Sequence, residues 1–472
     1  MYEYDVSIVG AGPAGLFAAL EIAERSKGNV KILIIDRGYR ASQRRCLITA
    51  SHRGGECKRC TPCHILHGVG GAGALSSGTI NLRPDVGGDL DKLVGSWEVA
   101  ENLIRYVDRI FLRFGASNRL YIPDPEASRE LERISAKAGA KFIPVKQRHI
   151  GTENTVKVVE NITYHLESLG VKFLVGTKVR RVDKKGNSFV LTTESGNYTS
   201  KIVLLAPGRS GAAWLSEEAK RVGLETSPGP LDIGVRVEVP AYVMEPITNL
   251  VMDPKIIMYT KAYDDKVRTF CTNPNGFVVE ELYDDDTVGV NGESYRSIKS
   301  QNTNFALLVT IRLTNPMEDT IEYGKNIARM ATKLGGGKPL IQRLGDLEAG
   351  RRSTWSRIER STIEPTLKNA SPGDIGMALP YRVLTNILEA IHRLDVIAPG
   401  VASSQTLLYA PEIKYYSLRV AVNNDMETNI ENLFVAGDGA GLSRGINVAA
   451  ATGILAARGI LKKLGFTVED EV

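Results

Sequence analysis

The first 36 residues combine two short apolar runs with one helical pattern. Val6, Ile8 and Val9 form a run of the kind that a strand covered on both faces needs. Small and apolar residues then recur at helical spacing from Ala14 to about Ser26. A second apolar run occupies 30–35. This order predicts a strand–helix–strand unit whose two strands are parallel neighbours in one sheet.

The remaining pattern divides the chain at about residue 229. Before this point we expect helices at 91–115 and 155–169, and strands at 172–174, 178–183, 188–193 and 201–206. Beyond it, apolar and polar positions alternate in four segments, as in an antiparallel sheet, at 233–239, 256–259, 267–272 and 306–313. A strand at 432–436 and a helix at 446–464 follow near the C-terminus.

These elements predict an α/β fold in which a Rossmann-type domain contains an inserted, mainly antiparallel α+β substrate domain. We expect residues 1–228 to form the first part of the Rossmann-type domain, including a loop at 37–78. Residues 229–400 would form the inserted domain, and 401–472 would return to the first domain.

A glycine turn joins the first strand to its helix. The sequence Gly-Ala-Gly-Pro-Ala-Gly at 10–15 matches the dinucleotide-binding pattern, in which glycines allow a tight turn and a close approach of a pyrophosphate. The helix that follows would direct its N–H groups at the phosphates. Asp36 ends the second strand, where a carboxylate can bind a ribose. The expected contacts of the dinucleotide in this unit are Gly10, Gly12, Pro13, Ala14, Gly15, Asp36 and Arg37.

A second glycine-rich segment, 68–73, has the same glycine spacing, but no strand precedes it. We expect it to bring backbone N–H groups close to a ring or a phosphate, with contacts at Gly71, Ala72 and Gly73, and the alternative is a flexible surface loop. The strand at 201–206 ends in small residues that suggest a return to the same sheet, with contacts at Ala206 and Gly208.

The C-terminal segment indicates which dinucleotide is bound. A strand ends at Gly437 and Asp438, and a helix rich in small residues begins near Gly445 and Ile446. The carboxylate would bind a polyol hydroxyl, and the helix start would face a flavin ring or a phosphate. One dinucleotide held at both ends of the chain, with one complete glycine fingerprint, favours FAD over NAD.

Four of the five cysteines lie within eighteen residues of a basic loop, at Cys46, Cys57, Cys60 and Cys63. Three cysteines at two-residue intervals with a fourth nearby are typical of ligands to a 4Fe-4S cluster. The ferredoxin pattern differs, since its fourth cysteine lies downstream and is followed by proline. Zinc, with His64 or His67 as further ligands, and redox-active thiols remain alternatives.

Composition limits the other classes of function. A net charge of +5 is mild, so we expect no nucleic acid as partner. No stretch is apolar enough to cross a membrane, and acidic residues near the N-terminus argue against a signal peptide. We therefore expect a cytoplasmic protein, and the pattern makes no prediction of its oligomeric state.

The chain resembles the two-domain FAD-dependent oxidoreductases that include fumarate reductase and the tRNA-uridine-modifying flavoenzymes. The segments GAGPAG with Asp36, IVLLAPG and LFVAGDGAG carry this resemblance. The cysteine loop with GVGGAGALSSG, together with VNGESYRS, QNTNFALLV and LLYAPEIKYYSLRV, is similar to a poorly characterised family of FAD-dependent dehydrogenases. The resemblance covers nearly the whole chain and implies the fold and FAD, but no agreed substrate.

A hypothesis of function follows from these parts. FAD would exchange electrons with a cysteine-bound iron–sulfur cluster and with a small-molecule substrate, and the basic loop would dock an acidic electron donor such as ferredoxin. Glu412 and Lys414, two apart on a strand, would supply a proton and an anion contact, and the alternative is a surface pair. Other hypotheses are a reductase that takes hydride from NAD(P)H and a tRNA-modifying flavoenzyme.

Overall fold

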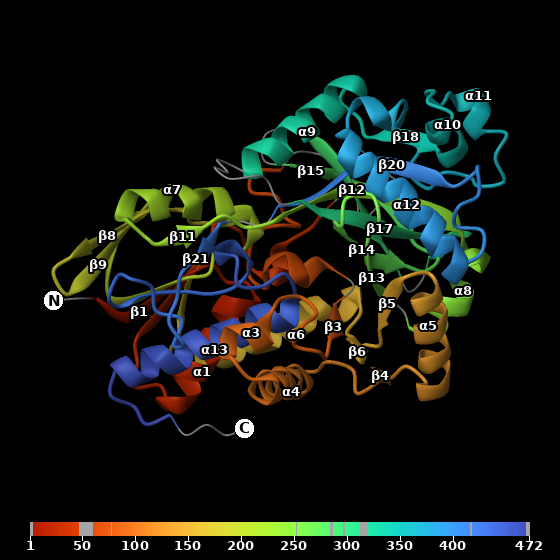
Figure 1. Cartoon of the computed structure of the whole chain (residues 1–472). Helices are drawn as coiled ribbons and strands as arrows, with labels where there is room; N and C mark the ends of the chain where they lie inside the picture. Colours follow the sequence, from red (N-terminus) through yellow and green to blue (C-terminus); the bar gives the residue numbers. More distant parts are fainter. Residues whose placement is uncertain are drawn as a thin grey trace.

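The computed structural model describes residues 3–46, 60–76, 78–251, 253–283, 287–295, 298–311, 320–415 and 418–468. These residues form two domains that lie side by side (Figure 1). None of the helices in these ranges is both long and apolar enough to cross a membrane.

The first domain is built on a seven-stranded sheet, and the predicted parallel pairing of its first two strands is confirmed. Its strands run in the order β7, β2, β1, β10, β9, β8, with β22 also paired to β10. The strands are β1 (Tyr4–Val9), β2 (Ile32–Ile35), β7 (Lys172–Leu174), β8 (Val179–Lys185), β9 (Ser188–Thr193), β10 (Gly196–Leu205) and β22 (Leu433–Val435). The helices of this domain are α1 (Pro13–Arg25), α3 (Leu90–Val94), α4 (Trp97–Arg113), α6 (Thr152–Ser168), α7 (Ala212–Val222) and α13 (Ile446–Lys463).

Short elements connect these layers. The 3-10 turns η1 (Ala41–Gln43), η2 (Gly71–Leu75), η3 (Arg209–Gly211) and η5 (Asp438–Ala440) lie in the loops that follow sheet strands. A small sheet contains β3 (Thr79–Asn81), β6 (Gln147–His149) and β4 (Leu120–Tyr121).

The second domain contains an eight-stranded, almost entirely antiparallel sheet in the order β19, β18, β20, β12, β17, β14, β13, β5. These strands are β19 (Ser371–Pro372), β18 (Leu340–Arg343), β20 (Leu407–Tyr415), β12 (Leu231–Pro240), β17 (Asn302–Ile311), β14 (Lys266–Asn273), β13 (Lys255–Tyr259) and β5 (Ala140–Ile143). Its other elements are the hairpin β15 (Phe277–Leu282) and β16 (Val288–Glu293), helices α5 (Pro125–Lys137), α8 (Ala241–Thr248), α9 (Thr320–Leu334), α10 (Leu344–Glu348), α11 (Trp355–Ile358) and α12 (Tyr381–Ile397), and the turn η4 (Ile375–Met377).

Two sequence-based expectations differ from this arrangement. The second domain was expected to occupy 229–400, but its sheet also contains β20, which pairs with β12, and β5, which pairs with β13. The single helix expected at 91–115 is two helices, because Gly95 adopts φ +72° and Ser96 caps α4 through a hydrogen bond from Val99 N.

The central sheet of the second domain has one apolar and one polar face. Along β12, Leu231, Ile233, Val235 and Val237 belong to the core that also contains residues of α8, α9 and α12. The intervening residues Asp232, Gly234, Arg236 and Glu238 therefore lie on the opposite face. We call the side of the sheet that carries these four residues the polar face.

The chain leaves the first domain before β12 and returns to it after β20 at neighbouring places. β11 (Thr226–Ser227) pairs with β21 (Arg419–Val420), and beyond them β12 pairs with β20, Leu231 facing Tyr415. The outgoing and returning strands thus run side by side. Asp232 and Lys414, which also face each other, are consequently the residues of the polar face at the end of the sheet nearest the first domain.

Candidate active site

The glycine turn after β1 has the geometry that the sequence predicts. Gly10 adopts φ +104°, and a side chain there would place its first carbon 2.1 Å from the Ala206 carbonyl oxygen. At Gly15 the same carbon would lie 2.0 Å from the Gly10 carbonyl oxygen, so α1 packs tightly against the turn. α1 begins with Pro13 after Gly12, and no side chain caps its N-terminus. The first N–H groups of the helix therefore lack a side-chain acceptor.

Asp36 lies directly after β2 and is half-buried beside this turn. Its carboxylate accepts hydrogen bonds from Ala11 N at 2.9 Å and from Gly38 N at 2.8 Å, one on each oxygen. Each carboxylate oxygen has a second lone pair, which a ribose hydroxyl can use. Arg37 follows at the start of the basic loop and is also half-buried.

The second glycine-rich segment packs on the first. Gly70 N donates to Ala11 O at 2.8 Å, and a side chain at Gly71 would come within 3.1 Å of Gly12 Cα. Ala72 is exposed at the tip, whereas a side chain at Gly73 would meet Ile446 at the start of α13. The segment thus joins the starts of α1 and α13, which contradicts the alternative of a flexible surface loop.

The turn that follows β22 packs against the start of α1 and against the turn that follows β10. A side chain at Gly437 would come 3.0 Å from the Ala14 side chain, and one at Gly439 would come 2.6 Å from Gly208 O. The Asp438 carboxylate pairs with Arg209 Nε at 2.9 Å and accepts a hydrogen bond from Ser443 Oγ. α13 begins after Gly445, again without a side-chain cap.

These residues fit FAD. Two helix starts that lack side-chain caps, α1 and α13, meet at three glycine-rich turns whose close backbone approaches leave no room for side chains. Helix N-termini favour an anion such as a pyrophosphate. Asp36 at one end and Asp438 at the other would bind the hydroxyls of the dinucleotide, and FAD would supply redox chemistry at this site.

The polar face presents charged side chains at the end nearest this turn. Asp232 is 2 % exposed and accepts from Arg268 Nη2 at 2.7 Å and from Thr310 Oγ1 at 2.7 Å. On the neighbouring strand, Lys414 Nζ lies 3.2 Å from Glu412 and 3.4 Å from Glu281. Burial alone would lower the pKa of Lys414, but these two carboxylates raise it above its usual value.

The polar face also faces the FAD end of the first domain. Lys414 experiences the charge of Arg209, the partner of Asp438, across the domain junction. The returning strand packs on the same turn, because a side chain at Gly441 would lie 2.8 Å from Arg419 Cα. Asp438 and the polar face are therefore on opposite sides of one junction.

Arg236 is the centre of the buried part of the polar face. Its guanidinium makes two hydrogen bonds to Glu412, Nε to Oε2 at 2.7 Å and Nη2 to Oε1 at 2.6 Å, and both side chains have no exposed area. It also donates to Cys271 O, Asn304 Oδ1 and Asn291 Oδ1. Two parallel charge-assisted hydrogen bonds thus fix the orientation of the Glu412 side chain.

The two residues expected to be catalytic thus have different surroundings. Glu412 and Lys414 do share one face, as their spacing predicts, and the alternative of a surface pair is wrong because both are buried. Asp232, Arg236 and Arg268 were not identified from the sequence. The signal that could have found Asp232 and Arg236 is the alternation Asp-x-Gly-x-Arg-x-Glu at 232–238, which places charges on one face of a strand.

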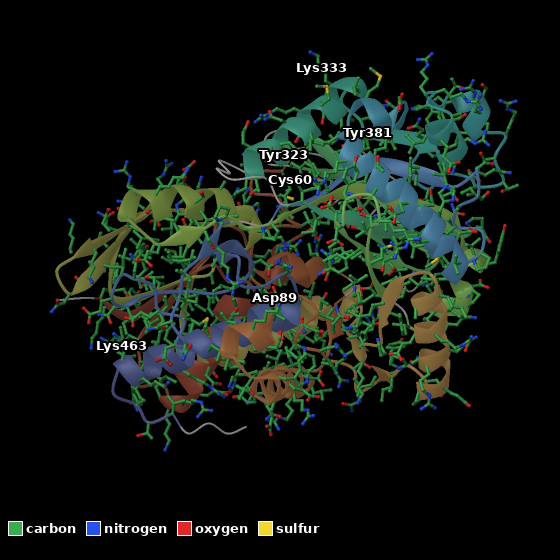
Figure 2. All side chains as sticks on the ribbon, viewed as in Figure 1. Cys60, Asp89, Tyr323, Lys333, Tyr381 and Lys463 are labelled. Carbon is green, nitrogen blue, oxygen red and sulfur yellow. The ribbon has the colours of Figure 1, made fainter. Side chains whose placement is uncertain are left out.

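The described ends of the cysteine loop are held together by Arg44. This buried guanidinium donates to His64 O, Ile65 O and Val69 O, and burial lowers its pKa to about 10. Cys46 and Cys63 are half-buried, and Cys57 lies outside the described residues. Cys60 is exposed and lies near the domain junction in Figure 2. Within the described ranges, no group of three or more His, Cys, Asp or Glu side chains is arranged to hold a metal ion.

Comparison with known proteins identifies two matching families and several similar chains. Residues 5–305 match the model of the FAD dependent oxidoreductases, and residues 230–415 match that of the FAD-dependent protein, C-terminal domain-like. An uncharacterised protein of Clostridium beijerinckii is 26 % identical over 97 % of this chain and 80 % of its own length.

Similar solved structures include two oxidoreductases. Glycine oxidase from Geobacillus kaustophilus aligns over 100 % of both chains with 14 % identity and a TM-score of 0.41. L-proline dehydrogenase from P. horikoshii aligns over 99 % of this chain and 95 % of its own with 13 % identity and a TM-score of 0.42. Because the first family model spans more than half of the chain, the protein belongs to the family of FAD dependent oxidoreductases.

Proposed function

We propose that this FAD-dependent oxidoreductase acts on a small polar molecule that binds at the domain junction, between the Asp438 turn and the polar face. The observation that carries the proposal is the charged end of that face, where Asp232, Arg268 and Lys414 lie on the strands nearest the FAD-binding turns. A site between the cofactor domain and a second domain is where small substrates usually bind.

Two roles follow for the residues on β20. Lys414 contacts an anionic or polar group of the substrate, since it is the member of the pair nearer the junction. Glu412 positions Arg236 and Lys414 and does not supply a proton, because both of its oxygens accept hydrogen bonds from Arg236. This assignment replaces the proton-donor role suggested by the spacing alone.

We further propose that the cysteine loop holds a 4Fe-4S cluster that exchanges electrons with FAD. Its support is the spacing of Cys46, Cys57, Cys60 and Cys63, together with Arg44, which ties the start of the loop to the segment beside the glycine turn. An acidic electron-transfer protein such as ferredoxin would dock on the basic residues of this loop.

Anaerobic purification followed by an absorption spectrum and analysis of iron, acid-labile sulfide and zinc tests both parts. The proposal predicts bound FAD, with iron and sulfide at about four of each per chain. Protein that holds FAD but neither iron nor sulfide would contradict the relay. Stoichiometric zinc together with rapid bleaching of the flavin by NADH or NADPH would favour a nicotinamide-dependent reductase instead.

The substrate-binding part is tested separately by reduction kinetics. Once a reducing substrate is found by screening, Lys414→Met should raise its KM at least about tenfold, because a buried charge-assisted contact is lost. Lys333→Met, on the far side of the second domain in Figure 2, is the control. An unchanged KM in Lys414→Met would place the substrate elsewhere.

A further inference from the structure

Lys266 is a cation of the polar face that has no ion-pair partner among the described residues. It begins β14, two residues before Arg268, so the two side chains lie on the same face of the sheet. Arg268 pairs with Asp232, and Lys414 pairs with Glu412 and Glu281. In the described ranges, by contrast, no carboxylate lies within ion-pair distance of the half-buried Lys266 ammonium.

The surroundings of Lys266 come from both domains. Asp232 and Arg268 act on it from its own sheet, and Arg444 and Asp89 act on it from the first domain. Arg444 directly precedes Gly445, where α13 begins, and lies 3.8 Å from Asp89. Asp89 lies on the side of the first domain that faces the second (Figure 2). Lys266 is therefore opposite the helix start that contributes to the FAD site.

We propose that Lys266, with Arg444 across the junction, forms a subsite for an anionic group of the substrate, so that the substrate is a small organic anion. A cation that is partly removed from water without a counter-ion is stabilised when an anion binds beside it. Arg268 and Lys414, the neighbouring cations of the polar face, already have carboxylate partners. One unpaired ammonium thus fits one negatively charged group, either a carboxylate or a phosphate.

The electrostatics of the site agree with an anion-binding role. Burial, followed by the charges of Arg268 and Arg444, lowers the pKa of Lys266, while Asp232 and Asp89 oppose this change. A bound anion would raise the pKa again, since it favours the charged form of the amine. Anion binding and protonation of Lys266 therefore support each other, and affinity should fall as the pH rises through the lysine pKa.

The test uses the FAD-loaded protein in low-chloride buffer and three small probes: propionate, inorganic phosphate and the neutral propionamide. Binding is followed by isothermal titration and by the change in the flavin absorption spectrum. Lys266→Ala should weaken the preferred anion at least about tenfold, and Lys266→Arg should retain most of the affinity. Lys261→Ala is the matched control, because Lys261 is exposed on the turn that leads into the same strand.

The probe that binds best indicates the chemical class of the substrate. Preference for propionate identifies a carboxylate substrate, and preference for phosphate identifies a phosphorylated one. Equal binding of propionamide, anion binding unchanged in Lys266→Ala, or no binding of any probe would overturn the subsite. This inference rests on the proposed function, which places the substrate at the domain junction. The two can fail separately. A substrate that reduces the flavin with a KM unaffected by Lys414→Met would refute the junction site, whatever anion Lys266 binds.

Discussion

Replacement of Arg236 by methionine should destabilise the second domain more than any surface substitution. The variant removes both hydrogen bonds to Glu412 and leaves that carboxylate fully buried, with Lys414 at 3.2 Å as its remaining cation. It also leaves the oxygen atoms of Cys271, Asn291 and Asn304 without this donor.

The size of the effect follows from the burial of the pair. Breaking a buried ion pair by removing one partner typically costs about 3–5 kcal/mol, and the neighbouring Lys414 places Arg236→Met near the middle of that range. We therefore expect the free energy of unfolding to fall by about 4 kcal/mol. For a domain of this size the melting temperature would fall by roughly 8–16 °C.

The double variant Arg236→Met/Glu412→Met tests the cause of that loss. It removes both charges, and Lys414 keeps Glu281 as its partner at 3.4 Å. Replacing a buried pair by apolar side chains is often close to neutral. The double variant still leaves the oxygens of Cys271, Asn291 and Asn304 without their donor, so it should lose about 2 kcal/mol. Arg329→Met breaks an ion pair on the exposed surface of α9 and should change stability little.

Equilibrium unfolding in urea measures these differences, with tryptophan fluorescence as one probe and circular dichroism as another. A loss of less than about 1 kcal/mol in Arg236→Met would contradict a buried unpaired charge as the cause. A double variant as unstable as the sum of its two single variants would contradict it equally, because removing both charges should then have restored stability.

Three further predictions concern other parts of the molecule. Gly10→Val should abolish FAD binding in a folded protein, because its side chain would collide with the Ala206 carbonyl; a normal absorption spectrum of bound flavin would disprove this. Glu238→Gln should flatten the pH dependence of stability. Burial raises the pKa of Glu238 above 4.5, so the folded state keeps a proton that the unfolded state loses. The stability of the wild type therefore falls as the pH rises above about 4.5. A slope unchanged in the variant would assign it to other groups. Arg44→Met should expose the cysteine loop to limited proteolysis at least about tenfold faster, since three carbonyls lose their donor, and equal cleavage rates would contradict the role of Arg44.

The local parts of the fold were predictable because their signals are local. The glycine turn, Asp36 and the start of α13 each depend on residues close together in the sequence, and the structure places them as expected. The break at Gly95 and Ser96 was not predicted, although a glycine followed by an N-cap residue is a local signal for it.

The polar face was not predictable in the same way. Whether the charges of β12 meet water or protein depends on which strands pair with it, and these come from positions as distant as Thr310 and Glu412. The domain limits failed for a related reason, since β5 joins the second sheet although it lies far upstream in the chain. The burial of these charges and the limits of the domain both depend on pairing between strands that are far apart in the sequence, and a local sequence pattern does not predict such pairing.

A crystal structure of the FAD-loaded protein would show where the cofactor binds. We expect the pyrophosphate at the starts of α1 and α13, a ribose hydroxyl on Asp36, and the flavin ring at the junction. The ring would lie between the Asp438 turn and the end of the polar face that carries Asp232, Lys266 and Lys414. A flavin ring bound on another side of the first domain, away from these three residues, would contradict this placement.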